Sequence, residues 1–251
     1  MKGRDEMLRE DERIDDLQLG GLRIIQNRRG FRFGMDAVLL AHFAEVRPGD
    51  RVVDLGTGTG VIPLLLSGHS QAASLVGLEL QPAMADMAAR SVALNNLTDR
   101  VTIVEGDLRQ AGELLGVCTF DVVTCNPPYE RQGGGIVSAD DGQAIARHEV
   151  ACTLDDVCRA AYRLLREKGR LALVLRADRV IDLAETLRRN RLEPKRMCLV
   201  CPRADRAPHL ILVEATRGGN PGVRWLPPLI IHDERGQYTP ALAGIYGMEE
   251  V

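Results

Sequence analysis

The chain has no apolar run that approaches the roughly 20 residues needed to cross a bilayer. Residues 1–16 are rich in Asp and Glu and contain no apolar core segment, which argues against a secretory signal peptide. An overall excess of basic residues is also missing, because the formal net charge is −3. The composition therefore carries no general nucleic-acid signature, although a local basic patch is enough to bind RNA. With 251 residues, the chain is long enough for a single α/β domain.

A disulfide framework is not expected either. The six cysteines, without a secretion signal, are typical of reduced thiols in the cytosol, so we expect a cytoplasmic protein. Cys198 and Cys201 form the only close pair, but a zinc site would need a second such pair, and His209 is the only nearby imidazole. The pair also lies in an expected strand and not at a helix N-terminus, where a thiolate would be stabilised. We interpret both as structural thiols.

From position 51 the sequence alternates between strand and helix patterns. Such alternation predicts a doubly wound, mostly parallel α/β sheet, here with seven strands. No helix pattern separates the last two strands, so we expect them to form an antiparallel hairpin at the sheet edge. The expected strands are Arg51–Leu55, Leu75–Glu79, Val101–Glu105, Phe120–Cys125, Arg170–Leu175, Pro194–Val200 and His209–Ala215. The expected helices are Gly60–Ser67, Pro82–Leu97, Thr153–Arg166 and Asp178–Arg189.

The segments outside this core have different patterns. Residues 1–50 are expected to form an N-terminal extension, with a frayed acidic lead over 1–16, a hairpin over 16–26 and a helix over 37–44. Residues 51–216 form the predicted core. Residues 217–251 are rich in Pro and Gly and are expected to pack on the core as a surface tail.

The turn after the first core strand contains a glycine at every second position. Its sequence, from position 54 to 60, is Asp-Leu-Gly-Thr-Gly-Thr-Gly. A dinucleotide-binding loop would place its third glycine at position 61, which is Val61, and a phosphate-binding P-loop would end in lysine. The loop is instead suited to a ligand with a cationic amino group that Asp54 helps to hold. Gly56, Thr57 and Gly58 are the backbone candidates for close approach to that ligand.

Acidic residues follow the next two strands. Glu79 stands where a carboxylate can accept hydrogen bonds from both hydroxyls of a ribose. Asp107 ends the third strand and is a candidate for binding an adenine amine. The adjoining Leu80 and Leu108 are included in the same predicted binding surface. Each acid alone has an ordinary interpretation as a solvated strand-end or turn residue. Their order along the sheet gives them weight, because ligands of open α/β sheets bind at the carboxyl ends of strands.

The fourth strand is followed by Asn126-Pro127-Pro128-Tyr129. The Asn126 side-chain oxygen and the Pro127 carbonyl can accept hydrogen bonds from a planar NH₂ group. The two prolines restrict the backbone, and Tyr129 offers a face on which a base or an amide can stack. Pro-Pro after a strand is also a common loop signal. In this context we interpret the four residues as the catalytic centre for transfer onto an amine or amide nitrogen.

Taken together, the ordered set resembles the class I, Rossmann-like, S-adenosylmethionine-dependent methyltransferases over residues 30–216. Within that superfamily the four-residue motif is typical of enzymes that methylate adenine N6, guanine N2 or the glutamine side-chain amide. The resemblance implies S-adenosyl-L-methionine as the methyl donor and no metal. Asn126 and Pro127 would accept from the target NH₂, and Tyr129 would stack on it.

Flanking segments resemble the bacterial tRNA(Val) adenine-N6 methyltransferase family, which modifies the adenine beside the anticodon. They are residues 31–40, 147–149 and 229–239. In that family the segment before the glycine loop covers the cofactor, which makes Phe33 and Asp36 cofactor-binding candidates here. A buried aromatic and a helix N-cap are the alternative roles. The expected partner is therefore tRNA, and the oligomeric state stays open.

Basic residues supply the candidates for contact with RNA. Several lie in one stretch on the last helix and the edge hairpin, where they could follow a phosphate backbone or simply form a solvated face. Others lie in or after a glycine-rich loop beside the catalytic motif. The candidates are Arg131, Arg147, His148, Arg189, Lys195, Arg196, Arg203 and Arg206.

Three other functions stay open at this point. A protein glutamine-N5 methyltransferase acting on a release factor shares the motif, but that family usually has a separate N-terminal helical domain for which residues 1–51 are too short. A ribosomal RNA base amino-methyltransferase is a second alternative. A non-enzymatic RNA-binding module is a third, and the complete glycine loop and catalytic motif argue against it.

Overall fold

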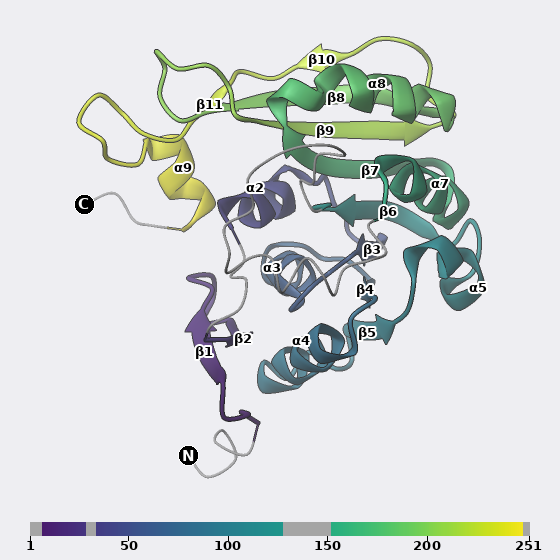
Figure 1. Ribbon diagram of the computed structural model, residues 1–251, viewed down its shortest axis with the longest axis vertical. Helices are drawn as coiled ribbons and strands as arrows, with labels where there is room; N and C mark the ends of the chain where they lie inside the picture. Colours follow the sequence, from purple (N-terminus) through teal and green to yellow (C-terminus); the bar gives the residue numbers. More distant parts are fainter. Residues whose placement is uncertain (1–6, 29–33, 128–151, 248–251) are drawn as a thin grey trace, which may run out of the picture.

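The computed structural model describes residues 7–28, 34–127 and 152–247. Its central sheet contains seven long strands in the order β8-β9-β7-β6-β3-β4-β5 (Figure 1). They are β3 (Arg51–Leu55), β4 (Ser74–Glu79), β5 (Val101–Glu105), β6 (Phe120–Cys125), β7 (Leu165–Arg176), β8 (Leu192–Cys201) and β9 (Leu210–Arg217). The seven strands expected from the sequence are thus confirmed. β7 begins five residues earlier than expected, at Leu165, in a segment partly assigned to the preceding helix, and the other ends differ by at most two residues.

The strand directions match those of a doubly wound sheet with an antiparallel edge. β3 pairs in parallel with β4 and β6, and β6 pairs in parallel with β7. β9 is antiparallel to both β7 and β8, so β8 and β9 form the expected hairpin. Because β8 runs in the same direction as β6 and β7, all of these strands except β9 have their carboxyl ends at one edge of the sheet.

Helices cover both faces of the sheet because neighbouring strand residues point in opposite directions. Val52 and Val122 pack on one face with α2 (Met35–Phe43), α3 (Val61–His69), α4 (Pro82–Leu94) and α9 (Pro240–Ile245). Val53 and Val123 pack on the other with α5 (Ala111–Leu115), α7 (Leu154–Leu164) and α8 (Val180–Arg189). The sequence analysis did not predict α5 or α9, nor the short 3₁₀ helices η1 (Leu108–Gln110) and η2 (Ala177–Arg179).

The N-terminal hairpin exists, but its first strand was placed wrongly. β1 is Glu12–Asp16 and β2 is Arg23–Asn27, paired antiparallel, whereas the sequence analysis assigned residues up to 16 to a frayed lead. The reason is a distant ion pair. The Glu12 carboxylate is buried and accepts 2.6 Å hydrogen bonds from both terminal nitrogens of Arg90 on α4. This contact holds the hairpin against α4, as Figure 1 shows for β1, β2 and α4.

The C-terminal segment has more regular structure than the expected tail. β10 (Arg224–Trp225) and β11 (Leu229–Ile230) both pair in parallel with β8, which brings the sheet to nine strands. α9 then returns toward α2. All six cysteines are free thiols, and both members of the Cys198/Cys201 pair are buried on β8. Among the helices that the structure describes, none is long and apolar enough to cross a membrane.

Candidate active site

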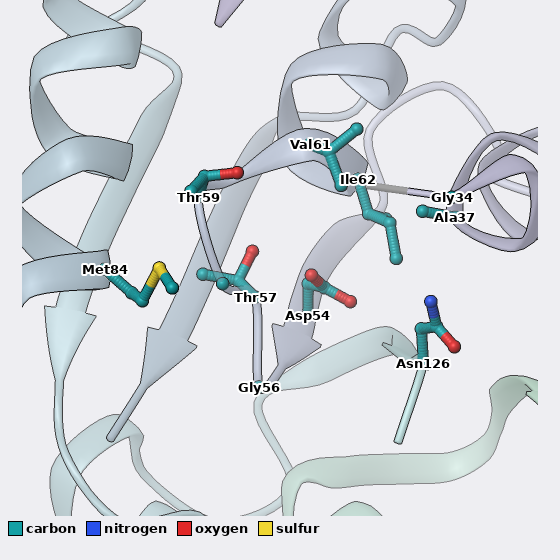
Figure 2. Close-up of a pocket in the computed structure, with 11 residues that line it drawn as sticks. Gly34, Ala37, Asp54, Gly56, Thr57, Thr59, Val61, Ile62, Met84 and Asn126 are labelled. Carbon is teal, nitrogen blue, oxygen red and sulfur yellow. The ribbon is translucent and has the colours of Figure 1, made fainter. Parts of the chain in front are cut away.

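A pocket opens where the carboxyl ends of β3 and β6 meet the start of α2 (Figure 2). Figure 2 shows the side chains of Asp54 and Thr57 between Met84 of α4 on one side and Asn126 on the other. The pocket thus joins the two groups that the sequence identified separately, the glycine loop and the catalytic motif. Its lining residues are Gly34, Ala37, Asp54, Gly56, Thr57, Gly58, Thr59, Val61, Ile62, Met84 and Asn126.

The glycine loop is held by the neighbouring strand. The N–H groups of Gly56 and Thr57 both donate to the Leu78 carbonyl, at 2.8 and 3.0 Å. Gly56 and Gly58 have φ values of +68° and +57°, which L-residues with side chains rarely adopt. A Cβ atom on either glycine would meet no other atom within 4 Å, so the loop backbone faces open space. A ligand can therefore approach this backbone closely.

Among the residues that line the pocket, Asp54 carries the ionisable side chain. Its side chain is 1% exposed, and Oδ1 accepts a 2.7 Å hydrogen bond from the Thr124 hydroxyl on β6. Oδ2 is buried and has no hydrogen-bond partner within the described part of the chain. Burial raises the pKa of this carboxyl to about 7, against a smaller opposing effect of the Thr124 hydrogen bond. A buried carboxylate oxygen that lacks a donor is suited to a cationic group. The residue thus fits the ammonium end of S-adenosylmethionine.

Glu79 lies at the end of β4 and is also buried. Its Oε2 accepts a 2.8 Å hydrogen bond from the Gly58 N–H, and its Oε1 accepts a 2.9 Å bond from the Gln81 N–H. A carboxylate offers about four acceptor positions, so two further donors can be accommodated. The two hydroxyls of a ribose would meet that requirement.

Asp107 follows β5 and begins η1. Its carboxylate accepts hydrogen bonds from the Arg109 backbone N–H at 2.9 Å and from Arg109 Nε at 2.8 Å. The hydrogen bond from the Arg109 side chain is the main cause that lowers the pKa of Asp107. The acid is therefore held as a carboxylate. Leu108 is partly buried, and Leu80 is an exposed large apolar residue.

The structure describes the expected catalytic motif as far as its second residue. Asn126 lines the pocket, and Pro127 is buried beside it. Pro128 and Tyr129 lie outside the described residues, as do Phe33, Arg131, Arg147 and His148. Asp36 lies in the first turn of α2, next to the pocket residues Gly34 and Ala37, and its Oδ1 accepts a 3.0 Å hydrogen bond from the Ala37 N–H.

The predicted basic stretch does not form one surface. Arg189 ends α8, which precedes β8, whereas Arg203 and Arg206 follow the carboxyl end of β8. The ten residues of β8 span about 30 Å, so these groups lie far apart. Arg189 pairs with Asp155 at 3.0 Å. Lys195 is partly buried, and its ammonium donates to the carbonyls of the 220–222 turn.

Arg196 was wrongly assigned to RNA contact. Its side chain is buried, with the whole residue only 8% exposed. The guanidinium pairs with Glu45 and with Glu214, the latter at 3.2 Å, and it also covers the Phe43 ring at 4.4 Å. A buried guanidinium held by two carboxylates cannot reach a phosphate. Arg196 instead attaches the segment after α2 to the antiparallel edge of the sheet.

Several residues that line the pocket or support its lining were not expected from the sequence. Thr124 has no motif of its own, and its role follows from the register that places it opposite Asp54 on the adjacent strand. Met84 enters from the first turn of α4. Val61 and Ile62 follow the glycine loop directly, and that position was the one available signal for them.

Comparisons with known proteins agree with this geometry. Residues 34–190 match the family described as "Methyltransferase small domain". The protein "tRNA1(Val) (adenine(37)-N6)-methyltransferase" of Porphyromonas gingivalis is 33% identical over 86% of this chain and 88% of its own length. The protein of the same name from Pasteurella multocida is 31% identical over 88% of this chain and 91% of its own length.

Solved structures show the same fold. A "predicted O-methyltransferase" of Agrobacterium tumefaciens superposes with a TM-score of 0.69 at 24% identity, over 86% of this chain and 98% of that chain. The Pyrococcus horikoshii TYW2 structure gives a TM-score of 0.58 at 15% identity, over 84% of this chain and 73% of that one. The chain therefore belongs to the methyltransferase small domain family and, within it, to the group of the tRNA1(Val) (adenine(37)-N6)-methyltransferases.

Proposed function

We propose that the protein methylates N6 of an adenine in tRNA, at the position beside the anticodon, with S-adenosyl-L-methionine as the donor. The observation that carries the proposal is the meeting of Asn126 with the Asp54 loop in one pocket. The tRNA1(Val) relatives, which are similar over most of the chain, support adenine 37 as the target. We expect the reaction to take place in the cytoplasm, with tRNA as the macromolecular partner of the protein.

The cofactor, when bound, supplies a methyl group on a sulfonium, which is reactive toward nitrogen nucleophiles. Asp54 would hold its ammonium group through the oxygen that lacks a donor, and Glu79 would accept from the ribose hydroxyls. Asp107, with Leu80 and Leu108, would hold the base. Phe33 and Asp36, in the segment before the glycine loop, would cover the cofactor. These assignments extend the pocket along the carboxyl ends of β3, β4 and β5.

The nitrogen to be methylated is a weak nucleophile, because its lone pair is delocalised into the ring. Asn126 Oδ1 and the Pro127 carbonyl would accept hydrogen bonds from its N–H groups and orient the lone pair. Positive charge is relocated in this reaction and is not created, so position and hydrogen-bond acceptance are the main contributions expected from the protein. Pro128 and Tyr129 would complete the site by fixing the backbone and stacking on the adenine.

The test is to incubate the protein with methyl-labelled S-adenosylmethionine and, in separate reactions, bacterial tRNA, ribosomal RNA and a translation release factor. Digestion followed by mass spectrometry then identifies the labelled product. N6-methyladenosine from the tRNA reaction is the expected result. Label in methylglutamine would assign the protein to the other amide-methylating class, and label in ribosomal RNA would change the substrate. Cofactor binding without transfer to any acceptor would contradict an enzymatic role.

A further inference from the structure

Two turns meet beyond the carboxyl end of β8. The first, residues 202–208, joins β8 to β9, and the second, residues 232–238, follows β11. The His232 N–H donates to the Pro202 carbonyl at 3.0 Å, and Arg203 Nη2 donates to the Glu234 carbonyl at 3.4 Å. Since β8 is parallel to β6 and β7, this double turn lies at the edge of the sheet where β6 and β7 also end (Figure 1). The pocket lies at the same edge.

The second turn is rigid. An antiparallel bridge pairs His232 with Tyr238, and the Asp233 N–H donates to the Gln237 carbonyl at 2.9 Å. The Asp233 carboxylate accepts from the backbone N–H groups of Arg235 and Gln237, both at 2.9 Å. These contacts restrain the backbone of the turn before any partner binds, which lowers the entropy cost of binding.

Three aromatic rings lie together at the base of this turn, two of them stacked and the third tilted by 33°. The Tyr238 ring is parallel to the Tyr246 ring, with 7° between the planes and 6.2 Å between centroids. The His232 ring lies 5.3 Å from Tyr238. Tyr246 is half-buried against the core, whereas Tyr238 is 42% exposed. Tyr238 is thus held between the protein and solvent, with Tyr246 and His232 beside it and part of the residue exposed.

The stack is connected to the pocket through α9 and α2, which contact each other. Burial raises the pKa of the Tyr246 phenol, and Asp36 is one of the negative groups that add to the shift. Asp36 lies between the pocket residues Gly34 and Ala37. Across the sheet, three strand spacings separate β6 from β8, about 14 Å, and β11, which leads into the turn, lies one spacing further out. The turn is therefore too far from Asn126 to hold the target nucleotide, and it can hold another nucleotide of the same RNA strand.

Three arginines lie on the same two turns as the exposed ring. Arg206 and Arg235 are exposed, and Arg203 is partly exposed. Asp205 is the nearest opposing carboxylate, at 3.6 Å from Arg203 Nε and 3.8 Å from Arg206 Nε. These are loose surface pairs, which contribute little and are readily exchanged for phosphate. The Asp233 carboxylate is directed into its own turn. The Glu234 side chain is the other acid exposed on the turn.

We propose that the double turn is an RNA-docking surface on which an unpaired base from the same RNA loop as the target adenine stacks against Tyr238. Arg203, Arg206 and Arg235 contact the neighbouring phosphates. The inference rests on the proposed function, since it names how the tRNA substrate of that same site is held. Base stacking on an aromatic ring is tolerant of sequence, and it is typical of proteins that bind unpaired nucleic acid.

The test uses the full-length protein with the variants Tyr238→Ala, Tyr238→Phe and Arg235→Ala. The matched control is Trp225→Ala, which removes another exposed aromatic, 57% exposed, on β10. Affinity for a fluorescent anticodon stem-loop RNA is measured without turnover, and kcat and KM for tRNA methylation are measured separately. Thermal unfolding and cofactor affinity show whether each variant is folded.

Tyr238→Ala is expected to weaken RNA binding and raise the tRNA KM by about tenfold, with kcat at saturating tRNA and cofactor affinity kept. Tyr238→Phe should restore binding, because stacking needs only the ring. Arg235→Ala should reduce the salt dependence of binding by about one counterion. Trp225→Ala should match the wild type.

In one outcome, the wild-type protein methylates tRNA while the folded Tyr238→Ala variant binds RNA as tightly as the wild type. That result overturns the docking surface and leaves the proposed function intact. A wild-type protein that neither binds the stem-loop nor methylates tRNA overturns both. Equal losses in Tyr238→Ala and Trp225→Ala would show a general aromatic effect and would also contradict the assignment.

Discussion

The carboxylate of Glu79 accepts the backbone N–H of Gly58 at 2.8 Å, which joins the end of β4 to the glycine loop that follows β3. One side chain thereby fixes the loop while keeping acceptor capacity for a ligand. The sequence places the two residues 21 positions apart, and each was assigned to the cofactor for a different reason. Their hydrogen bond joins the loop and the acid that is expected to bind the ribose into one unit.

Replacing Glu79 by alanine is expected to weaken cofactor binding by about 10- to 100-fold, because hydrogen bonds to a charged acceptor are lost. Turnover at saturating cofactor should stay within a few-fold of the wild type. Calorimetry with S-adenosylhomocysteine measures the affinity. Glu105→Ala is the matched control, since Glu105 is the register partner of Glu79 on β5 and is exposed. Unchanged affinity of Glu79→Ala for S-adenosylhomocysteine would contradict the ribose assignment.

For Asn126→Ala the expected pattern is the reverse. Cofactor affinity should be kept, and kcat for N6-methyladenosine formation should fall by about 100-fold or more, because one positioned acceptor for the target NH₂ is removed. Asn220→Ala, an exposed asparagine in the C-terminal segment, is the matched control. Single-turnover methylation measures the chemical step. An equal loss of cofactor affinity would count against the catalytic role.

Asp54 makes cofactor binding depend on pH. Burial raises its pKa to about 7, so below pH 7 the free protein must release a proton before the carboxylate can pair with a cationic ligand. Affinity should therefore fall by up to about tenfold per pH unit below 7, with proton release on binding. Isothermal calorimetry in buffers of different ionisation enthalpy measures that proton. Asp54→Asn should bind more weakly and lose this dependence, and a wild type without it would contradict the shifted pKa.

The same group affects stability with a defined sign. Its folded-state pKa of about 7 exceeds the ordinary value of 3.8, so its contribution is fully present below pH 3.8 and is lost as the pH rises to 7. The ligand-free protein should thus lose on the order of 4 kcal/mol of unfolding free energy across that interval, relative to Asp54→Asn. Urea unfolding of both proteins at several pH values gives the difference. Parallel curves for the two proteins would refute the prediction.

A methyl group at position 77 should displace Thr57 of the glycine loop, because β4 lies directly beside that loop. A Cβ atom on Gly77 of β4 would lie 2.7 Å from Thr57 Cγ2 and 2.9 Å from Ile103 Cδ1. Gly77→Ala is expected to weaken cofactor binding by about tenfold through displacement of Thr57, with a modest loss of stability. Gly244→Ala is the control, because nothing lies within 4 Å of the position of its Cβ. Equal affinities in both variants would show that the loop tolerates the shift.

Arg196→Ala separates structure from RNA contact. Removing a buried guanidinium leaves Glu214 buried without its partner, which costs about 3–5 kcal/mol of unfolding free energy. RNA affinity of the folded variant should be unchanged, because the side chain does not reach the surface. Denaturant unfolding and stem-loop binding give the two quantities. A selective loss of RNA affinity at full stability would restore the original assignment.

The long strands and the turns that follow them at the pocket could be predicted because their signals are local. β3, β5 and β6 have the same bounds as the apolar runs in the sequence, since buried parallel strands are apolar on both faces. Asp54 and Glu79 were located by their position after such strands. The pocket contains Asp54 and Asn126 together, in agreement with the expected order along the sheet.

The features that could not be predicted depend on distant partners. Glu12 belongs to an acidic run that was expected to be a frayed lead. Its ion pair with Arg90, 78 positions away, makes it part of a strand. Arg196 was read with its basic neighbours, although its partners are Glu45 and Glu214. α5, with five residues, is too short to show a helical period. No local pattern carries this information.

β10 and β11 occupy the side of β8 that does not face β9. An unprotected strand at that position would present a row of unpaired backbone groups to any other extended chain, which is a common route to aggregation. The C-terminal segment prevents this while its turn carries Tyr238. A change that detached the segment would therefore promote self-association of the protein along β8 in addition to weakening the hold on RNA.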